Sequence, residues 1–141
     1  MLDAITAYCE RTSQPAPQAP PEFTQCVLES LAFKYRAVLE SLEELTGLRF
    51  SEIRIIGGGS KNRLLNQFTA NASGRAVVAG PVEATALGNI AMQMLATGAV
   101  ASLKEARAII DRSFPSERYE PKDSDRWDRA YARFLQMTTA F

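Results

Sequence analysis

A short apolar segment, a glycine triplet and the start of a helix follow one another in residues 53–65, which read IRIIGGGSKNRLL. The isoleucine-rich run 53–56 predicts a short buried strand. Ser60 is placed to cap a helix over 61–72. A second short strand is predicted over 76–79, because four small and β-branched apolar residues follow a helix-ending glycine. The order strand, helix, strand indicates a parallel β-α-β unit.

The triplet Gly57, Gly58 and Gly59 admits two interpretations. Glycine loses more backbone entropy on folding than any other residue, so three in succession need a reason. A tight turn from strand to helix would require one or two of them. A ligand lying against the loop would use all three, with the free N–H groups of the next helix directed at an anion. The spacing matches neither the P-loop nor the Rossmann fingerprint.

Upstream of this unit, apolar spacing predicts a short helix over 2–11 and a long one over 22–46. Four prolines within residues 14–21 predict an extended connection between the two helices. Gly47 is expected to end the long helix. One apolar stripe should lie along this helix, at steps of three and four residues. It consists of Phe23, Val27, Leu31, Tyr35, Val38, Leu42 and Leu45.

Three more helices are predicted downstream. Pro81 and Glu83 are expected in the first turn of a helix that stops at Gly98, since proline and an acidic residue both suit a helix start. Ser102, followed three residues later by a glutamate, is a capping box that opens a helix to about residue 112. After a loop with two prolines, the last helix is predicted over 124–139, with Trp127 on its apolar face.

Composition excludes several classes of function. A chain of 141 residues has the size of one domain. Its 16 basic and 16 acidic residues balance, so the net charge does not indicate electrostatic binding to nucleic acid or to an anionic membrane. No apolar run approaches the roughly 20 residues that span a bilayer. The absence of histidine excludes Ser-His-Asp catalysis and histidine-ligated metals within this chain. Since the first residues lack the pattern of a signal peptide, we expect a cytoplasmic location.

The two cysteines, Cys9 and Cys26, are too few for a zinc site with four protein ligands of the usual type. Buried free thiols are the favoured interpretation in a cytosolic protein. A contact or bridge between the two, across the proline segment, is the alternative.

The motifs around the triplet resemble a known family. Residues 53–67, IRIIGGGSKNRLLNQ, are similar to the adenosine motif of the FGGY carbohydrate kinases, which belong to the actin, hexokinase and Hsp70-like ATPase superfamily. The continuations 69–75, TANASGR, and 79–90, AGPVEATALGNI, resemble the rhamnulokinase branch. Other FGGY kinases typically have Ala-Asp at 70–71 and Gly-Ala-Ala at 88–90. The similarity extends over nearly the whole chain and includes Tyr119-Glu120-Pro121.

The resemblance implies an α/β fold, namely part of a ribonuclease-H-like, actin-like ATPase lobe that is helix-rich with a short parallel two-strand β-α-β core. It implies that residues 1–141 form the C-terminal part of the kinase's nucleotide-binding domain, with 14–21 as a connection inside it. Gly57, Gly58 and Gly59 would form the backbone platform under the ribose and α-phosphate, and Asn62 would face the adenine. A solvated helix residue is the alternative for Asn62, and Lys61 and Arg63 are interpreted as solvated charges.

The resemblance also implies an activity, the transfer of phosphate from Mg-ATP to L-rhamnulose to give L-rhamnulose 1-phosphate and ADP. The Asp-x-Gly-Thr phosphate hairpin and the aspartate near the cleft have no match in this sequence. We therefore expect no catalytic residue, no Mg²⁺ ligand and no sugar contact on this chain. The fragment alone should be inactive and should self-associate. A non-catalytic nucleotide-binding module, or a helical interaction module from a truncated kinase, stays open as an alternative.

Overall fold

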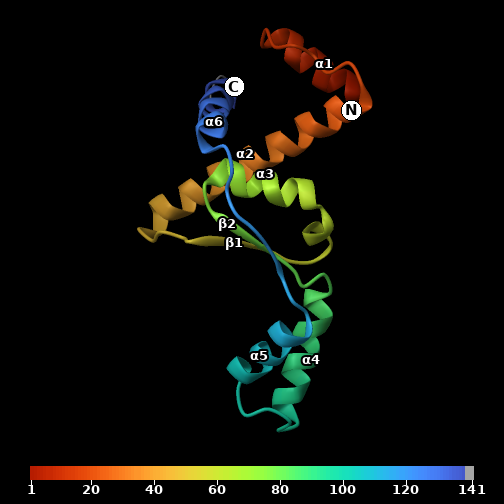
Figure 1. Ribbon diagram of the computed structural model, residues 1–141, viewed down its shortest axis with the longest axis vertical. Coiled ribbons are helices and arrows are strands. Elements are labelled where there is room, and N and C mark those ends of the chain that lie inside the picture. Colours follow the sequence, from red (N-terminus) through yellow and green to blue (C-terminus); the bar gives the residue numbers. More distant parts are fainter. Residues whose placement is uncertain (139–141) are drawn as a thin grey trace.

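The computed structural model describes residues 1–138. Figure 1 shows a small central sheet, with α2, α3 and α6 gathered towards one end of the molecule and α4 and α5 at the other. The elements in chain order are α1 (Leu2–Arg11), α2 (Pro20–Thr46), β1 (Glu52–Ile55), a 3-10 turn η1 (Gly58–Lys61), α3 (Arg63–Ser73), β2 (Ala76–Ala79), α4 (Ala84–Ala96), α5 (Leu103–Ser113), β3 (Glu117–Tyr119) and α6 (Ser124–Thr138).

The predicted β-α-β unit is present, and a third strand extends it. β1 and β2 pair in parallel, with Ile53 opposite Val77, and α3 connects them. β3 pairs antiparallel with β2, with Tyr119 opposite Val77, so the strand order is β1-β2-β3. The sequence predicted a loop here, and that prediction is wrong. The fold is thus a helix-rich α/β arrangement around a three-stranded mixed sheet.

α2 begins two residues earlier than predicted, at Pro20. Proline is tolerated in the first turn of a helix, where its missing N–H would have no partner in any case. The Glu22 carboxylate accepts hydrogen bonds from the N–H groups of Gln18 at 2.6 Å and Ala19 at 3.4 Å, which fixes the start of the helix. The helix ends as predicted at Gly47, which has a φ of 67°.

The main core joins α2, α3 and α6 through aromatic side chains. The ring of Phe33 lies 5.4 Å from that of Trp127, and the ring of Phe68 lies 5.1 Å from that of Trp127. Arg36 stacks over Tyr131 at 4.1 Å and donates to the Ala72 carbonyl at 2.9 Å. The core thus contacts the face of α2 that carries Phe33 and Arg36.

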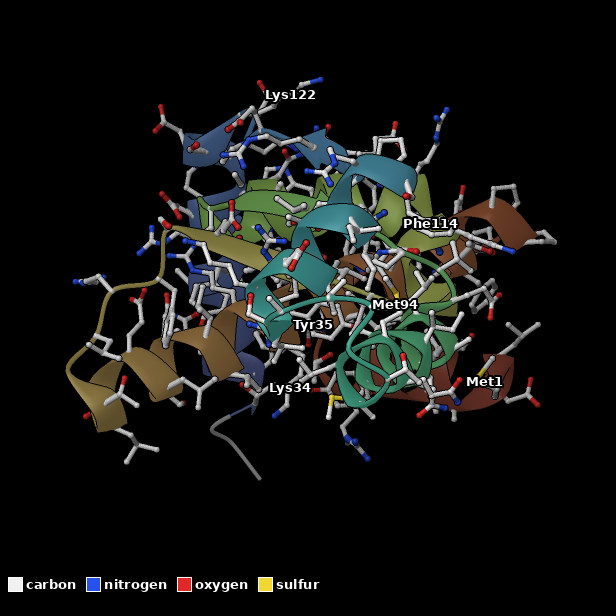
Figure 2. The ribbon with its side chains drawn as sticks, turned by 90° about the horizontal axis from the view of Figure 1, so that it is seen from below. Met1, Lys34, Tyr35, Met94, Phe114 and Lys122 are labelled. Carbon is white, nitrogen blue, oxygen red and sulfur yellow. The ribbon has the colours of Figure 1, made fainter. Side chains whose placement is uncertain are left out.

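The apolar stripe expected on α2 lies largely on its other face. Side chains along it are exposed, among them Tyr35 at 41%, Leu42 at 46% and Leu45 at 83%. Figure 2 labels Tyr35 of this stripe and also Phe114, an exposed aromatic residue directly after α5. Most of the stripe is therefore exposed in the part of the chain that the structure describes.

α4 and α5 pack mainly on each other, around Ala91, Val100 and Ala106. The predicted cap of α5 is confirmed, because the Glu105 N–H donates to the Ser102 hydroxyl at 3.2 Å. The start of α4 was predicted too early. Its first helical residue is Ala84, so Glu83 occupies the N-cap position and Pro81 precedes the helix in a cis peptide with Gly80.

At the other end of the chain, the predicted end of the last helix at Thr139 lies outside the described residues. Trp127 and Tyr131 of α6 are buried as its apolar face predicts. Cys9 on α1 is buried, Cys26 on α2 is half-buried, and both are free thiols. Burial raises the pKa of Cys26, and the neighbouring Cys9 adds to the rise. None of the helices within residues 1–138 is long and apolar enough to span a membrane.

A buried carboxylate, Glu43, connects the end of α2 to the segments that lead into β1 and β2. Its residue is 9% exposed, and its oxygens accept from the Phe50 N–H at 3.0 Å, from Arg49 at 3.0 Å and from Arg75 at 3.3 Å. The backbone hydrogen bond from Phe50, followed by the two arginines, holds the pKa of Glu43 below its ordinary value of 4.5.

This carboxylate predicts a pH dependence of stability. Because the folded pKa is depressed, the contribution of Glu43 is complete above pH 4.5 and is lost as the pH falls through the lowered folded pKa. We expect Glu43→Gln to lower the free energy of unfolding at pH 7 and to flatten its decline below pH 4.5. Urea denaturation from pH 7 to pH 3 measures both effects. Glu44→Gln, on the exposed neighbouring residue, is the control, and a decline of equal steepness in Glu43→Gln and the parent would contradict the assignment.

Candidate nucleotide-binding site

The loop between β1 and α3 is built around a backbone conformation that only glycine adopts easily. Gly57 has a φ of 77° and a ψ of −161°. Its N–H donates to the Pro81 carbonyl at 3.0 Å. Its own carbonyl accepts from the Ser60 N–H at 3.1 Å and from the Ser60 hydroxyl at 2.7 Å. Gly57 therefore satisfies a requirement of the turn itself.

Gly58 and Gly59 meet no such requirement. Neither has a positive φ. A Cβ added at Gly58 would have nothing within 4 Å, and one added at Gly59 would meet only the Ile55 side chain, at an ordinary 3.8 Å. Both residues are exposed. The chain leaves open room above this backbone, as a platform for a closely approaching ligand requires.

The glycine loop is tied to the turn that follows the neighbouring strand. The Gly80 N–H donates to the Ile55 carbonyl at 2.8 Å, and the Gly57 N–H reaches the Pro81 carbonyl. β1 and β2 are parallel, so these two turns meet at the carboxyl ends of both strands. Ligands of open α/β sheets bind in that position.

The helix cap differs from the prediction. Ser60 is 8% exposed and its hydroxyl is engaged inside the turn, so it does not cap α3. Asn62 does, because its Oδ1 accepts from the Leu65 N–H at 3.0 Å. The helix therefore begins at Arg63, two residues later than expected. Both residue types make good caps, and the 3-10 turn decides between them.

Gly57, Gly58, Gly59 and Asn62 thus lie together on one continuous turn. With the oxygen of Asn62 held by the cap, its amide nitrogen is the atom that it can offer to a ligand. Arg63, which was interpreted as a solvated charge, forms an ion pair with Glu117 at 3.1 Å. Within residues 1–138, no three carboxylate, thiol or imidazole side chains cluster as a metal site requires.

The sequence did not predict the role of Asn66 of α3, which contacts this loop. It is fully buried, and its amide Nδ2 donates to the Ser60 carbonyl at 2.9 Å. Asparagine is mostly exposed in proteins, so the residue type alone does not indicate burial. The one available signal was that Asn66, Thr69 and Ser73 recur at steps of three and four, so that they share a face of α3.

Comparisons with known proteins cover this loop. The family described as "FGGY family of carbohydrate kinases, C-terminal domain" matches residues 2–97. A rhamnulokinase of Bacteroides thetaiotaomicron is 47% identical over 134 residues, which is 95% of this chain and 28% of that protein. A rhamnulokinase of Enterococcus faecalis is 43% identical over 143 residues, covering 99% of this chain and 29% of that protein.

A third relative, a rhamnulokinase of Bacillus subtilis, is 44% identical over 126 residues, or 89% of this chain and 26% of that protein. The chain therefore spans less than a third of the length of the curated relatives that it matches. The family match covers more than half of the chain and includes β1, the glycine loop, α3 and β2. The chain belongs to the FGGY family of carbohydrate kinases and carries sequence of that family's C-terminal domain.

Proposed function

We propose that this chain is the ATP-binding C-terminal part of a cytoplasmic carbohydrate kinase of rhamnose metabolism. The reaction of the whole enzyme is ATP plus L-rhamnulose to ADP plus L-rhamnulose 1-phosphate. The choice of sugar is supported by the name rhamnulokinase that the three similar proteins carry. The role of this chain in the reaction is supported by the glycine loop.

The observation that carries the nucleotide site is the open space at Gly58. A Cβ there would meet nothing of the chain within 4 Å, and the residue is exposed beside the N-terminus of α3. In the proposed complex the ribose and α-phosphate lie against Gly57, Gly58 and Gly59. The free N–H groups and the dipole of the first turn of α3 favour the negative charge. The Asn62 amide nitrogen faces the adenine.

The remaining chemistry belongs to the part of the kinase that this chain does not include. Phosphoryl transfer needs Mg²⁺ ligands, donors to the β- and γ-phosphates, and a base for the sugar hydroxyl. The phosphate hairpin and the aspartate near the cleft that the family resemblance implies have no match in this sequence, which supports a chain that binds one end of the nucleotide and performs no turnover on its own.

Two measurements on the isolated chain test this function. Titration with ADP, followed by calorimetry and by NMR chemical shifts, should show weak, saturable binding with the shifts centred on residues 57–62. A coupled assay with Mg-ATP and L-rhamnulose should show no sugar-dependent release of ADP above background. Absence of any ADP-dependent shift would favour a helical interaction module instead. Sugar-dependent turnover would overturn the assignment of the catalytic groups to the rest of the kinase.

The exposed apolar stripe of α2 supports a second part of the proposal. In the whole kinase the stripe is covered by the rest of the polypeptide, and in the isolated chain a second copy covers it. The fragment therefore self-associates.

A further inference from the structure

The 3-10 turn η1 of the glycine loop has three faces, and one of them is open. A 3-10 helix has three residues per turn, so Gly58, Gly59 and Ser60 point in three different directions. Ser60 points into the chain, since it is 8% exposed and its hydroxyl donates to the Gly57 carbonyl at 2.7 Å. A Cβ added at Gly59 would lie 3.8 Å from the Ile55 side chain, and one added at Gly58 would have nothing within 4 Å. The open face of the turn is therefore the face of Gly58.

Lys61 lies on the same face of the turn as Gly58. Residues three apart eclipse each other in a 3-10 helix, and the Asn62 N–H ends this turn on the Gly59 carbonyl at 3.1 Å. A rise of about 2 Å per residue places Lys61 about 6 Å from Gly58 along the axis. As in an α-helix, the Cα–Cβ bond leans towards the N-terminus. The flexible four-carbon stem of the lysine is therefore long enough to bring its ammonium group above Gly58.

Lys61 is also a cation without an acidic partner. It is exposed, and within residues 1–138 no carboxylate lies within ion-pair distance of its ammonium group. Arg63, two residues further on, is held by Glu117 at 3.1 Å. Of these two basic residues beside Asn62, Lys61 is thus the one whose charge stays available to a ligand.

We propose that Lys61 is a phosphate-binding residue, whose ammonium group pairs with the α-phosphate of the nucleotide. This inference rests on the proposed function of the loop, in which the ribose and α-phosphate lie against the glycines. A phosphate on the open face of Gly58 is within reach of the lysine, whose ammonium group has three donors and no acceptor. Lysine binds phosphate as a point charge, and the free N–H groups at the start of α3 favour the same anion. In the chain without ligand the side chain is solvated, in agreement with its exposure.

The test compares three ligands that differ in their phosphates: adenosine, AMP and ADP. Lys61→Met keeps most of the stem and removes the charge. We expect it to weaken the binding of AMP and of ADP about fivefold and to leave the affinity for adenosine unchanged, as measured by NMR chemical-shift titration at low ionic strength. Lys61→Arg keeps the charge and should bind AMP within about twofold of the parent chain. A residue that only supported the loop would change the affinity for all three ligands together.

Arg63→Met is the matched control. It removes a positive charge two residues from Lys61, but one that Glu117 already engages. It should leave the affinity for AMP within about twofold of that of the parent. Added salt provides a second check, because 0.5 M NaCl should reduce the difference between the parent and Lys61→Met by screening the ion pair. Equal losses of AMP binding in Lys61→Met and Arg63→Met would show a general effect of net charge and overturn the assignment.

The remaining outcomes separate this inference from the proposed function. If the parent binds ADP and Lys61→Met binds AMP and ADP equally well, the role of Lys61 is overturned and the nucleotide site stands. A loss with ADP but none with AMP would overturn the pairing with the α-phosphate. An equal loss with adenosine and AMP would show that the stem supports the loop, which overturns phosphate binding. If the parent binds none of the three ligands, the proposed function fails and the inference fails with it.

Discussion

Gly58→Val should weaken the binding of ADP to this chain at least tenfold while changing the free energy of unfolding by no more than about 0.5 kcal/mol. At this position a larger side chain can block the ligand without disturbing the folded chain. Gly58 has no positive φ, and an added Cβ would meet nothing of the chain within 4 Å. The valine side chain is therefore free to stand above the loop without strain, in the space where the ribose and α-phosphate are proposed to lie.

A tenfold loss corresponds to about 1.4 kcal/mol, which the displacement of a ligand from its backbone platform readily exceeds. Gly58→Ala adds one methyl group and should give an intermediate loss. A graded response to side-chain size indicates steric exclusion rather than a change of backbone conformation. Gly57→Val would not be informative, because a φ of 77° makes any side chain strained there.

Gly88→Val provides the matched control. Gly88 lies in α4, is exposed, has no positive φ and likewise has nothing within 4 Å of an added Cβ. This substitution should leave the ADP affinity unchanged. Equal losses in Gly58→Val and Gly88→Val would point to a general effect on folding. No loss in Gly58→Val, with the parent binding ADP, would remove the glycine platform from the site.

The features that the sequence predicted correctly depend on local chemistry. Gly47 ends α2 because a residue with positive φ is needed there, and Ser102 caps α5 because its hydroxyl reaches an N–H three residues on. The glycine loop falls between β1 and α3 for the same kind of reason. Such signals act over one turn, so a single sequence is enough to find them.

The features that it missed depend on contacts between distant segments. β3 is a strand only because residues 117–119 pair with β2, about 40 positions earlier in the chain. The burial of Asn66 depends on the Ser60 carbonyl and on the core around it, and the recurrence of polar residues along one face of α3 is too weak a signal to predict that burial. Ser60 and Asn62 are both good helix caps, and only the 3-10 turn shows which one is used. Contacts between distant segments decided the first two cases, and the local 3-10 turn decided the third.

The exposed stripe on α2 has the largest consequence for the behaviour of the isolated chain. Its members recur at steps of three and four residues, so they form one continuous face. An open apolar groove of about 620 Å³ between α1, α2 and α6 continues this face, since Leu31 belongs to both. Exposed apolar surface on this scale marks a region that packs against something else.

We expect the chain to elute and scatter light as a dimer or larger species whose mass rises with concentration, above the 15.5 kDa of one copy. Two charges on the stripe, in Val38→Glu/Leu42→Glu, should shift it to the monomer, because burying a carboxylate without a partner is strongly unfavourable. The measurement is size-exclusion chromatography with light scattering over a hundredfold range of concentration.

Glu44→Lys also changes the charge of α2, at an exposed residue two positions from Leu42 but about 160° around the helix, away from the stripe. It should leave the association unchanged. If the parent chain is a monomer at all concentrations, the stripe remains exposed to solvent and the prediction of self-association is contradicted. Dissociation by Glu44→Lys to the same extent would show that the contact lies on another face of α2. Dissociation by the stripe variant alone would identify the face that the rest of the kinase is proposed to cover.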